Sequence, residues 1–301
     1  MIAYNQVTNT APSLDQQVAH AAEQLQAHGF DRYYNAIVGA YVSQVYKALP
    51  YRAFARATDR AKAPLTSLEQ AVTYSTLYAK SHFDRFYGVL THIMGDTKRA
   101  QASSKTINIV DYGCGQGIAS LALISYLESY VNCESFTLNF YLVEPSQVTL
   151  DVAELLVSKM SSRIAANISI HTHHQDLNDF LEHGSETLAA ADYSMHLFSN
   201  LLDIAEVQQQ IPSLCHYLHN IEGKQTVIAV GPQYSSNYEG LNQLKDSLSD
   251  VNIKQDVADF CVESEIYSVM RNHWKHEPAY GVMMGLCFHN KASVSQAPIA
   301  A

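Results

Sequence analysis

Acidic residues in the middle of the chain stand where β-like runs end. Asp111 comes two residues before the first glycine of the segment Gly113-Cys114-Gly115-Gln116-Gly117. Glycine lets a backbone turn sharply, and the free N–H groups of a helix that starts there can bind a carboxylate or phosphate. The Asp111 carboxylate would repel a pyrophosphate but could receive a ligand ammonium group. The spacing also differs from the dinucleotide pattern GxGxxG, because Ile118 stands where the third glycine would fall.

Two further carboxylates follow the next two β-like runs. Glu144 ends the second run, where a carboxylate can accept hydrogen bonds from both hydroxyls of a ribose. Asp176 follows the third run and could accept from an exocyclic amine such as adenine N6. Together the three acids fit a neutral-to-cationic nucleoside better than a phosphorylated one. Structural alternatives stay open: the glycine turn can serve packing, Glu144 can be a simple strand-end carboxylate, and Asp176 can be a helix N-cap.

These acids need a scaffold of alternating elements, and the sequence supplies one. The β-rich runs are 106–111, 138–144, 167–171, 192–198 and 225–231, followed by β-like stretches at 263–270 and 279–289. Amphipathic segments of helix length lie between these runs at 117–130, 147–160 and 205–220. Strands that alternate with helices predict an α/β fold with a doubly wound, mostly parallel sheet of seven strands.

The first third of the chain has a different pattern. Residues 13–94 carry apolar side chains at three- and four-residue spacing, which predicts an all-helical region. A polar stretch follows at 95–105. We therefore expect a helical cap over 1–104, a Rossmann-like domain over 105–291 and a flexible tail over 292–301.

Over about 106–290 the chain resembles the class I S-adenosylmethionine-dependent methyltransferases. The resemblance rests on the acid and glycine turn, on Glu144 and Asp176, and on segment 196–203 after the fourth run. It implies S-adenosylmethionine as cofactor and methyl transfer as reaction. The long separation of Gly117 from Glu144 departs from the usual pattern. The positions that the resemblance assigns to the cofactor are Asp111, Gly113, Cys114, Gly115, Gly117, Glu144, Pro145, Asp176, Leu177, Phe198, Ser199 and Asn200.

Candidates for the acceptor side come from three places. In the family's topology the loop between the last two strands lies on the ligand face, so His273 is the first candidate for a general base. His196, at the end of the fourth run, is the second. An aromatic stripe on 74–86 could close over the cofactor. The predicted substrate contacts are Tyr78, His82, Arg271 and Trp274. Each candidate has a structural alternative. The loop with His273 can be an exposed hairpin loop, His196 can be a core histidine, and the aromatic stripe can be ordinary helix packing.

Charge and composition restrict the function classes. The net charge is −10, and residues 106–301 carry 22 acidic against 8 basic side chains, which disfavours binding to a phosphate backbone. The five cysteines form no CxxC pair, and the histidines at 171–174 lack an obvious carboxylate partner, so we predict no metal and a reduced, cytoplasmic setting. No apolar run is long enough to predict a membrane span.

The resulting prediction is a methyltransferase that acts on an O or N atom of a small molecule. One alternative is a protein, peptide or carrier-bound substrate, which the repeat of Arg52, Arg56 and Arg60 would favour as a docking face. Another is a non-catalytic scaffold that only binds the cofactor. An exposed aromatic stripe would also be compatible with a homodimer through the N-terminal helices.

Overall fold

The computed structural model describes residues 11–59, 62–95, 105–183, 188–248 and 251–290. Its centre is a seven-stranded sheet in the order β3-β2-β1-β4-β5-β7-β6. All neighbouring pairs from β3 to β5 are parallel, whereas β7 runs antiparallel to both β5 and β6. The strands are β1 (Lys105–Tyr112), β2 (Phe136–Val143), β3 (Asn167–His173), β4 (Tyr193–Ser199), β5 (Gly223–Gly231), β6 (Asn252–Ser268) and β7 (His273–Asn290).

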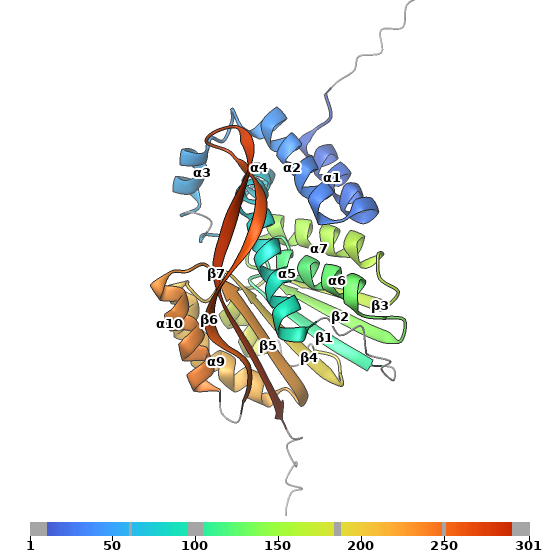
Figure 1. The fold of residues 1–301 in the computed structure, drawn as a ribbon, viewed down its shortest axis with the longest axis vertical. Coiled ribbons are helices and arrows are strands. Elements are labelled where there is room, and N and C mark those ends of the chain that lie inside the picture. Colours follow the sequence, from blue (N-terminus) through green and yellow to red (C-terminus); the bar gives the residue numbers. More distant parts are fainter. Residues whose placement is uncertain (1–10, 60–61, 96–104, 184–187, 249–250, 291–301) are drawn as a thin grey trace, which may run out of the picture.

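Helices cover both faces of this sheet (Figure 1). One face packs against α6 (Ile118–Tyr130) and α7 (Gln147–Ser161), together with the N-terminal helices. The other packs against α8 (Leu177–His183), α9 (Ala205–Asn220) and α10 (Ser235–Ser247). The doubly wound fold is therefore confirmed, and so is the antiparallel seventh strand that the methyltransferase resemblance implies.

The N-terminal region is helical, as predicted, and joins the first of these faces. Its α-helices are α1 (Leu14–His28), α2 (Phe30–Ala40), α3 (Tyr51–Ala57), α4 (Leu68–Tyr74) and α5 (Lys80–Met94). The π-helical turns η1 (Tyr41–Val45) and η2 (Ser75–Ala79) continue α2 and join α4 to α5. Buried side chains of α1, α2 and α5 belong to the same apolar cluster as those of β1, β2, α6 and α7.

Several elements differ from the sequence-based expectations. Both β6 and β7 are longer than the predicted stretches and form a hairpin that reaches the N-terminal helices (Figure 1). The short helix α8 was not predicted. The predicted boundary near residue 104 and the tail over 292–301 lie outside the described residues. Within the described part of the chain, no helix is long and apolar enough to cross a membrane.

Candidate functional site

The glycine turn joins β1 to α6 in a left-handed backbone conformation. Gly113, Gly115 and Gly117 have φ angles of 56°, 53° and 73°, values that cost little only for glycine. A Cβ atom added at Gly117 would lie 3.0 Å from Val157 Cγ2, so this glycine lets α6 approach α7. A Cβ added at Gly115 would meet no atom within 4 Å, so there the missing side chain leaves the backbone open to a ligand.

Glu144 follows β2 and faces the same turn. Its Oε2 accepts a hydrogen bond from the backbone N–H of Gly115 at 3.0 Å, and its Oε1 accepts one from Ser146 at 3.0 Å. The side chain is buried, which raises the pKa of its carboxyl group above the usual value. Each oxygen keeps lone-pair capacity for another donor, because a carboxylate can accept about four hydrogen bonds. Glu144 can therefore bind both hydroxyls of a ribose while it holds the glycine turn.

Asp111 lies beneath the turn and is fully buried. Its Oδ2 accepts hydrogen bonds from the backbone N–H and the hydroxyl of Ser120, at 3.2 and 2.7 Å. Its Oδ1 is buried and has no hydrogen-bond partner among the described residues. Burial raises the pKa of this carboxyl group to about 7. An unpartnered buried acceptor next to the turn is consistent with a ligand group or a bridging water that would complete it.

A pocket opens at the carboxyl ends of β1, β2 and β4, where a doubly wound sheet binds its ligands. Its cavity volume is about 130 Å³, below the roughly 300–1,000 Å³ of typical small-molecule sites. Six predicted cofactor residues line it, namely Gly113, Gly115, Glu144, Pro145, Ser199 and Asn200. Gln116, inside the glycine turn, and Leu201, in segment 196–203, belong to segments that the resemblance already assigned to the site. The other lining residues, Lys62, Ala63, Pro64, Leu65, Thr149 and Ile204, were not predicted, and Tyr74 was predicted only as a member of the aromatic stripe.

The N-terminal region forms the opposite wall of this pocket. Leu65 is anchored there because its carbonyl accepts a 2.6 Å hydrogen bond from the Ser146 hydroxyl. Gln116, inside the glycine turn, donates to the carbonyl of Ala71 at 2.8 Å. Tyr74 adds an aromatic ring to the wall. Helices that precede the sheet in sequence thus complete the pocket, and the glycine turn itself holds them.

Tyr74 of this wall belongs to the aromatic stripe, together with Tyr78 and His82. The hydroxyl of Tyr74 lies 3.3 Å from His82 Nδ1, and the ring of Tyr78 stacks on that of His82 at a centroid distance of 5.8 Å. Desolvation lowers the pKa of His82 well below its usual value, so the imidazole is neutral at pH 7. Of these three residues only Tyr74 lines the pocket, so the predicted contacts Tyr78 and His82 are not among its lining residues.

The wall at the end of β4 is fixed by a buried arginine. Asn200 has a φ angle of 56°, in the left-handed region that asparagine tolerates better than most residues. Its Oδ1 accepts a 3.2 Å hydrogen bond from Arg85 Nη2, and its Nδ2 donates to Ser199 Oγ at 2.9 Å. Arg85 also donates to the carbonyls of Ser81 and Tyr280. This arginine is 6% exposed, and burial lowers the pKa of its guanidinium to about 10.

Several predicted cofactor residues lie outside the pocket. Asp176 is exposed and caps α8, because its Oδ1 accepts a hydrogen bond from the N–H of Asp179 at 2.9 Å. Leu177 is buried in the core below α8. Phe198 stacks on Tyr112 in the same core. Cys114 and Gly117 shape the turn without lining the pocket. In this structure Asp176 is thus a helix N-cap, which was the alternative to a role in adenine binding. No contact of its carboxylate places Asp176 at the pocket.

His196 is not a catalytic base in this structure. It is fully buried, and desolvation lowers its pKa to about 4. The side-chain amide of Gln225 donates hydrogen bonds to the carbonyls of Ile221, Glu222 and Gly223. Its amide oxygen therefore faces His196 Nε2 at 2.9 Å and accepts a hydrogen bond from it. Nδ1 therefore accepts from the Tyr112 hydroxyl at 3.0 Å. Both ring nitrogens are satisfied inside the core, as in the alternative of a core histidine.

The loop between β6 and β7 also lies away from the pocket lining. Trp274 packs edge-on against Tyr34 of α2 and against Tyr267, at centroid distances of 5.6 Å. His273 is exposed, and its ring lies 3.3 Å from the carbonyl oxygen of Arg271. Neither residue reaches the pocket, because the hairpin is longer than predicted and carries its tip up to the helices (Figure 1). The predicted roles of His273, Arg271 and Trp274 are thus not supported.

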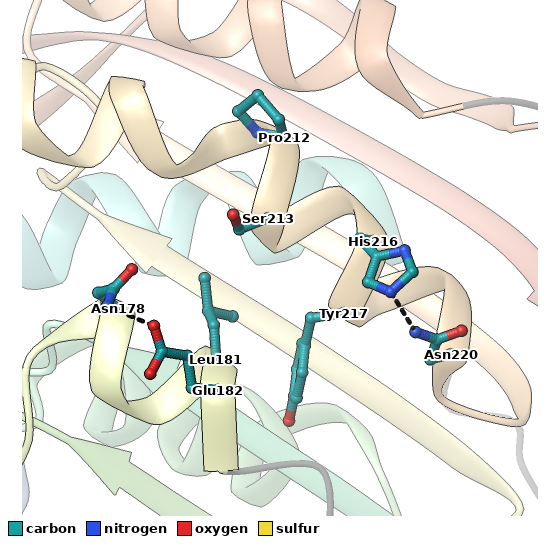
Figure 2. Close-up of a pocket in the computed structure, with 8 residues that line it drawn as sticks. All are labelled: Asn178, Leu181, Glu182, Pro212, Ser213, His216, Tyr217 and Asn220. Carbon is teal, nitrogen blue, oxygen red and sulfur yellow. Dashed lines mark hydrogen bonds between the residues drawn. The ribbon is translucent and has the colours of Figure 1, made fainter.

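A larger groove lies between α8 and α9, on the other face of the sheet (Figure 2). Asn178 and Glu182 bond to each other along α8, and His216 and Asn220 do so along α9. No predicted site residue lines this groove. Among the described residues, no group of three or more His, Cys, Asp or Glu side chains is placed to hold a metal ion.

Comparisons with known proteins give remote likenesses. No family model matches the chain, and no curated protein matches it. A structure assigned to the class I S-adenosylmethionine-dependent methyltransferases of Listeria monocytogenes is 13% identical, with 96% of this chain and 90% of that chain covered and a TM-score of 0.38. A SAM-dependent methyltransferase from Agrobacterium tumefaciens is 10% identical, with coverages of 70% and 62% and a TM-score of 0.38.

TrmN from Thermus thermophilus is likewise 10% identical, with 70% of this chain and 52% of that chain covered and a TM-score of 0.38. All three scores are below 0.5, so these likenesses carry no argument about activity.

Proposed function

We propose that this chain binds S-adenosylmethionine in the pocket at the end of β1, β2 and β4 and transfers its methyl group to a small molecule. The observation that carries the proposal is the meeting of the left-handed glycine turn with the buried Glu144 carboxylate. When bound, the cofactor supplies an electrophilic methyl group. The chain itself contributes a ribose acceptor, an exposed backbone at Gly115 and a polar wall at Ser199 and Asn200.

The small-molecule acceptor is supported by the position of the helical region. Segment 62–65 and Tyr74 stand across the pocket from the sheet, so the space is bounded on two sides. The excess of acidic side chains after residue 105 disfavours a phosphate backbone as partner. A protein or carrier-bound acceptor is the second candidate, because Arg52 and Arg56 are both exposed on α3. Arg60, the third member of that repeat, lies outside the described residues.

The first test is calorimetric titration with S-adenosylmethionine, S-adenosylhomocysteine and NADH. We expect micromolar binding of the two sulfur ligands and none of NADH. Glu144→Gln should weaken both sulfur ligands about 10- to 100-fold, since hydrogen bonds to a charged group contribute roughly 1.5–3 kcal/mol. Glu154→Gln makes the same chemical change at an exposed position on α7 and should leave binding unchanged. Folded protein that binds neither sulfur ligand would overturn the proposal.

The acceptor class needs a separate measurement. Purified protein is incubated with methyl-labelled S-adenosylmethionine and with the small-molecule, RNA and protein fractions of a cell extract. We expect the label in the small-molecule fraction. Label that accumulates in protein would favour the second candidate, and label in RNA would contradict both.

A further inference from the structure

We propose that the outer edge of β3, together with the groove between β3 and α7, is a docking site for an extended segment of another protein. That segment carries lysine or arginine at every second position and adds to the sheet as a further strand. The proposal does not depend on methyl transfer, because no residue of β3 and no residue of this groove lines the cofactor pocket.

β3 is the terminal strand on one side of the sheet, so one of its edges has no partner strand among the described residues (Figure 1). The carbonyl of His173 accepts a 3.0 Å hydrogen bond from the N–H of Glu144, so the backbone groups of His173 point toward β2. Backbone direction alternates along a strand. The N–H and C=O groups of Ile168, Ile170 and Thr172 therefore point away from the sheet and can pair with an added strand.

The two edges of the sheet differ in how they are protected. β6, at the opposite edge, carries Lys254 and has register shifts on both sides of Gln255. Charged side chains and bulges of this kind prevent edge-to-edge pairing. β3 contains neither lysine nor proline, and its register with β2 is continuous from Asn167 to His173. The outer edge of β3 thus lacks the features that protect β6.

A groove with a volume of about 460 Å³ runs along this edge. It is lined by Asp151, Glu154, Leu155 and Ser158 from α7 and by Ile168 and Ile170 from β3. The leucine and both isoleucines are half-buried, and the two carboxylates are exposed. Residues that lie opposite each other on paired strands share one face of the sheet. An added strand that pairs with Ile168 and Ile170 would therefore place its own side chains over the groove.

The charge of the groove favours lysine or arginine at these positions. The aliphatic stem of such a side chain can cover Ile168, Ile170 and Leu155 while its charged end reaches Asp151 or Glu154. Within the described part of the chain, neither carboxylate has an ion-pair partner. Side chains of a strand alternate between the two faces, so a basic residue would recur at every second position.

A second copy of this chain fits the surface less well. Two β3 strands that pair antiparallel across a two-fold axis would bring the Asp151 and Glu154 side chains of both copies to the same face of the joined sheet. The chain also has a net charge of −10. Like charges opposite each other destabilise strand pairing, whereas a basic segment offsets the acidic groove.

A peptide probe tests this docking site directly. A fluorescein-labelled peptide that alternates lysine and valine over the length of β3 is titrated with the full chain, and its anisotropy is measured. We expect micromolar binding that weakens as salt is added. The same peptide with methyl groups on the backbone nitrogens of its central lysine and the next valine keeps its charge but cannot pair as a strand. It should bind at least about tenfold more weakly.

Equal binding of the two peptides would overturn the proposal, because general attraction to an acidic chain would then explain it. Absence of binding by the unmodified peptide would overturn it as well. Neither outcome bears on the cofactor pocket, which calorimetry with S-adenosylhomocysteine tests separately.

Variants of the chain locate the binding. Thr172→Pro removes a donor from the outer edge but no hydrogen bond to β2, and it should weaken the unmodified peptide about tenfold. Asp151→Asn combined with Glu154→Gln should also weaken it and reduce its salt dependence. Asp179→Asn combined with Glu206→Gln makes the same charge change at exposed positions on the other face of the sheet and should leave binding unchanged.

Undiminished binding to folded Thr172→Pro would contradict the proposal. If that variant does not fold, the two peptides on the wild-type chain still decide. A concentration-dependent dimer in sedimentation that Thr172→Pro abolishes, without peptide binding to the wild-type chain, would assign this edge to a second copy instead.

Discussion

At the scale of single residues, Asp111 makes stability depend on pH. Its pKa is about 7 in the folded chain, above the usual value of 3.8. Between these values the folded state binds more protons than the unfolded state, so stability falls as pH rises, by up to about 1.4 kcal/mol per pH unit. An asparagine side chain cannot ionise, so Asp111→Asn should flatten this slope in urea unfolding between pH 4.5 and 7.5. Parallel profiles for the two proteins would contradict the assignment.

His196 provides a second residue-scale prediction. His196→Leu removes a hydrogen-bond partner from the Tyr112 hydroxyl and from the Gln225 amide oxygen, and each unsatisfied buried group costs about 1–3 kcal/mol. The free energy of unfolding should therefore fall, while the affinity for S-adenosylhomocysteine stays the same. His216→Leu, on the exposed side of α9, is the matched control and should change stability by less than about 0.5 kcal/mol. Loss of binding in folded His196→Leu would restore His196 as a site residue.

The sequence predicts that a residue belongs to the site where the backbone geometry of that position requires a particular amino acid. Gly115 and Glu144 belong to the pocket because a left-handed turn demands glycine and a strand end presents its last side chain to the ligand. Asp176 and His196 were ambiguous, because the same side chains satisfy a helix N-cap and a core hydrogen-bond chain equally well. Tyr74 lay in a recognisable stripe of aromatic residues, but the spacing alone did not say which member faces the pocket.

At the scale of elements, two glycines of the turn have different roles: Gly117 allows α6 to pack on α7, and Gly115 leaves the backbone open to a ligand. Gly117→Ala places a methyl group 3.0 Å from Val157 Cγ2 between α6 and α7, in addition to left-handed strain of about 1–2 kcal/mol. Gly115→Ala carries the same strain, but its methyl group enters open space at the pocket. We expect Gly117→Ala to lose more stability in urea unfolding, and Gly115→Ala to lose more affinity for S-adenosylhomocysteine. Equal effects of both variants on both measurements would contradict this division.

Element order was predictable, but element length was not. The alternation of β-rich and amphipathic runs predicted the parallel strands and the helices on both faces. The hairpin of β6 and β7 was underestimated because much of β6 is an exposed edge strand, whose polar residues resemble a loop. Its contacts with α2 join residues that are far apart in sequence, such as Tyr34 and Trp274, so no local pattern could indicate them.

At the scale of the whole molecule, the helical region and the sheet should unfold together. Tyr34 donates to the carbonyl of Thr76 and accepts from the N–H of Tyr267, so one hydroxyl joins α2, η2 and β6. Tyr34→Phe leaves both partners unsatisfied and should lower the midpoint of a single calorimetric transition. Tyr46→Phe, at a half-exposed ring, should not. Two separate transitions in the wild-type chain would show that the predicted domains are energetically independent.

The aromatic residues of the N-terminal helices also bear on assembly. In the stripe on 74–86, Phe83 and Phe86 are buried within the chain, whereas Tyr74 and Tyr78 are partly exposed and Tyr74 lines the pocket. Sedimentation measurements will decide whether dimers form. Met270 and Trp274, at the hairpin tip, are the more exposed apolar side chains to mutate if they do.

The position of β7 between β5 and β6 has a consequence for synthesis of the chain. On the ribosome β5 emerges well before β7, yet β7 is the strand that covers its free edge and then carries β6 on its other side. A nascent chain that has made only β1 to β5 thus exposes an unpaired edge to chaperones and to neighbouring nascent chains. The free edge of β5 can be covered only when β7, which is translated after β6, has left the exit tunnel.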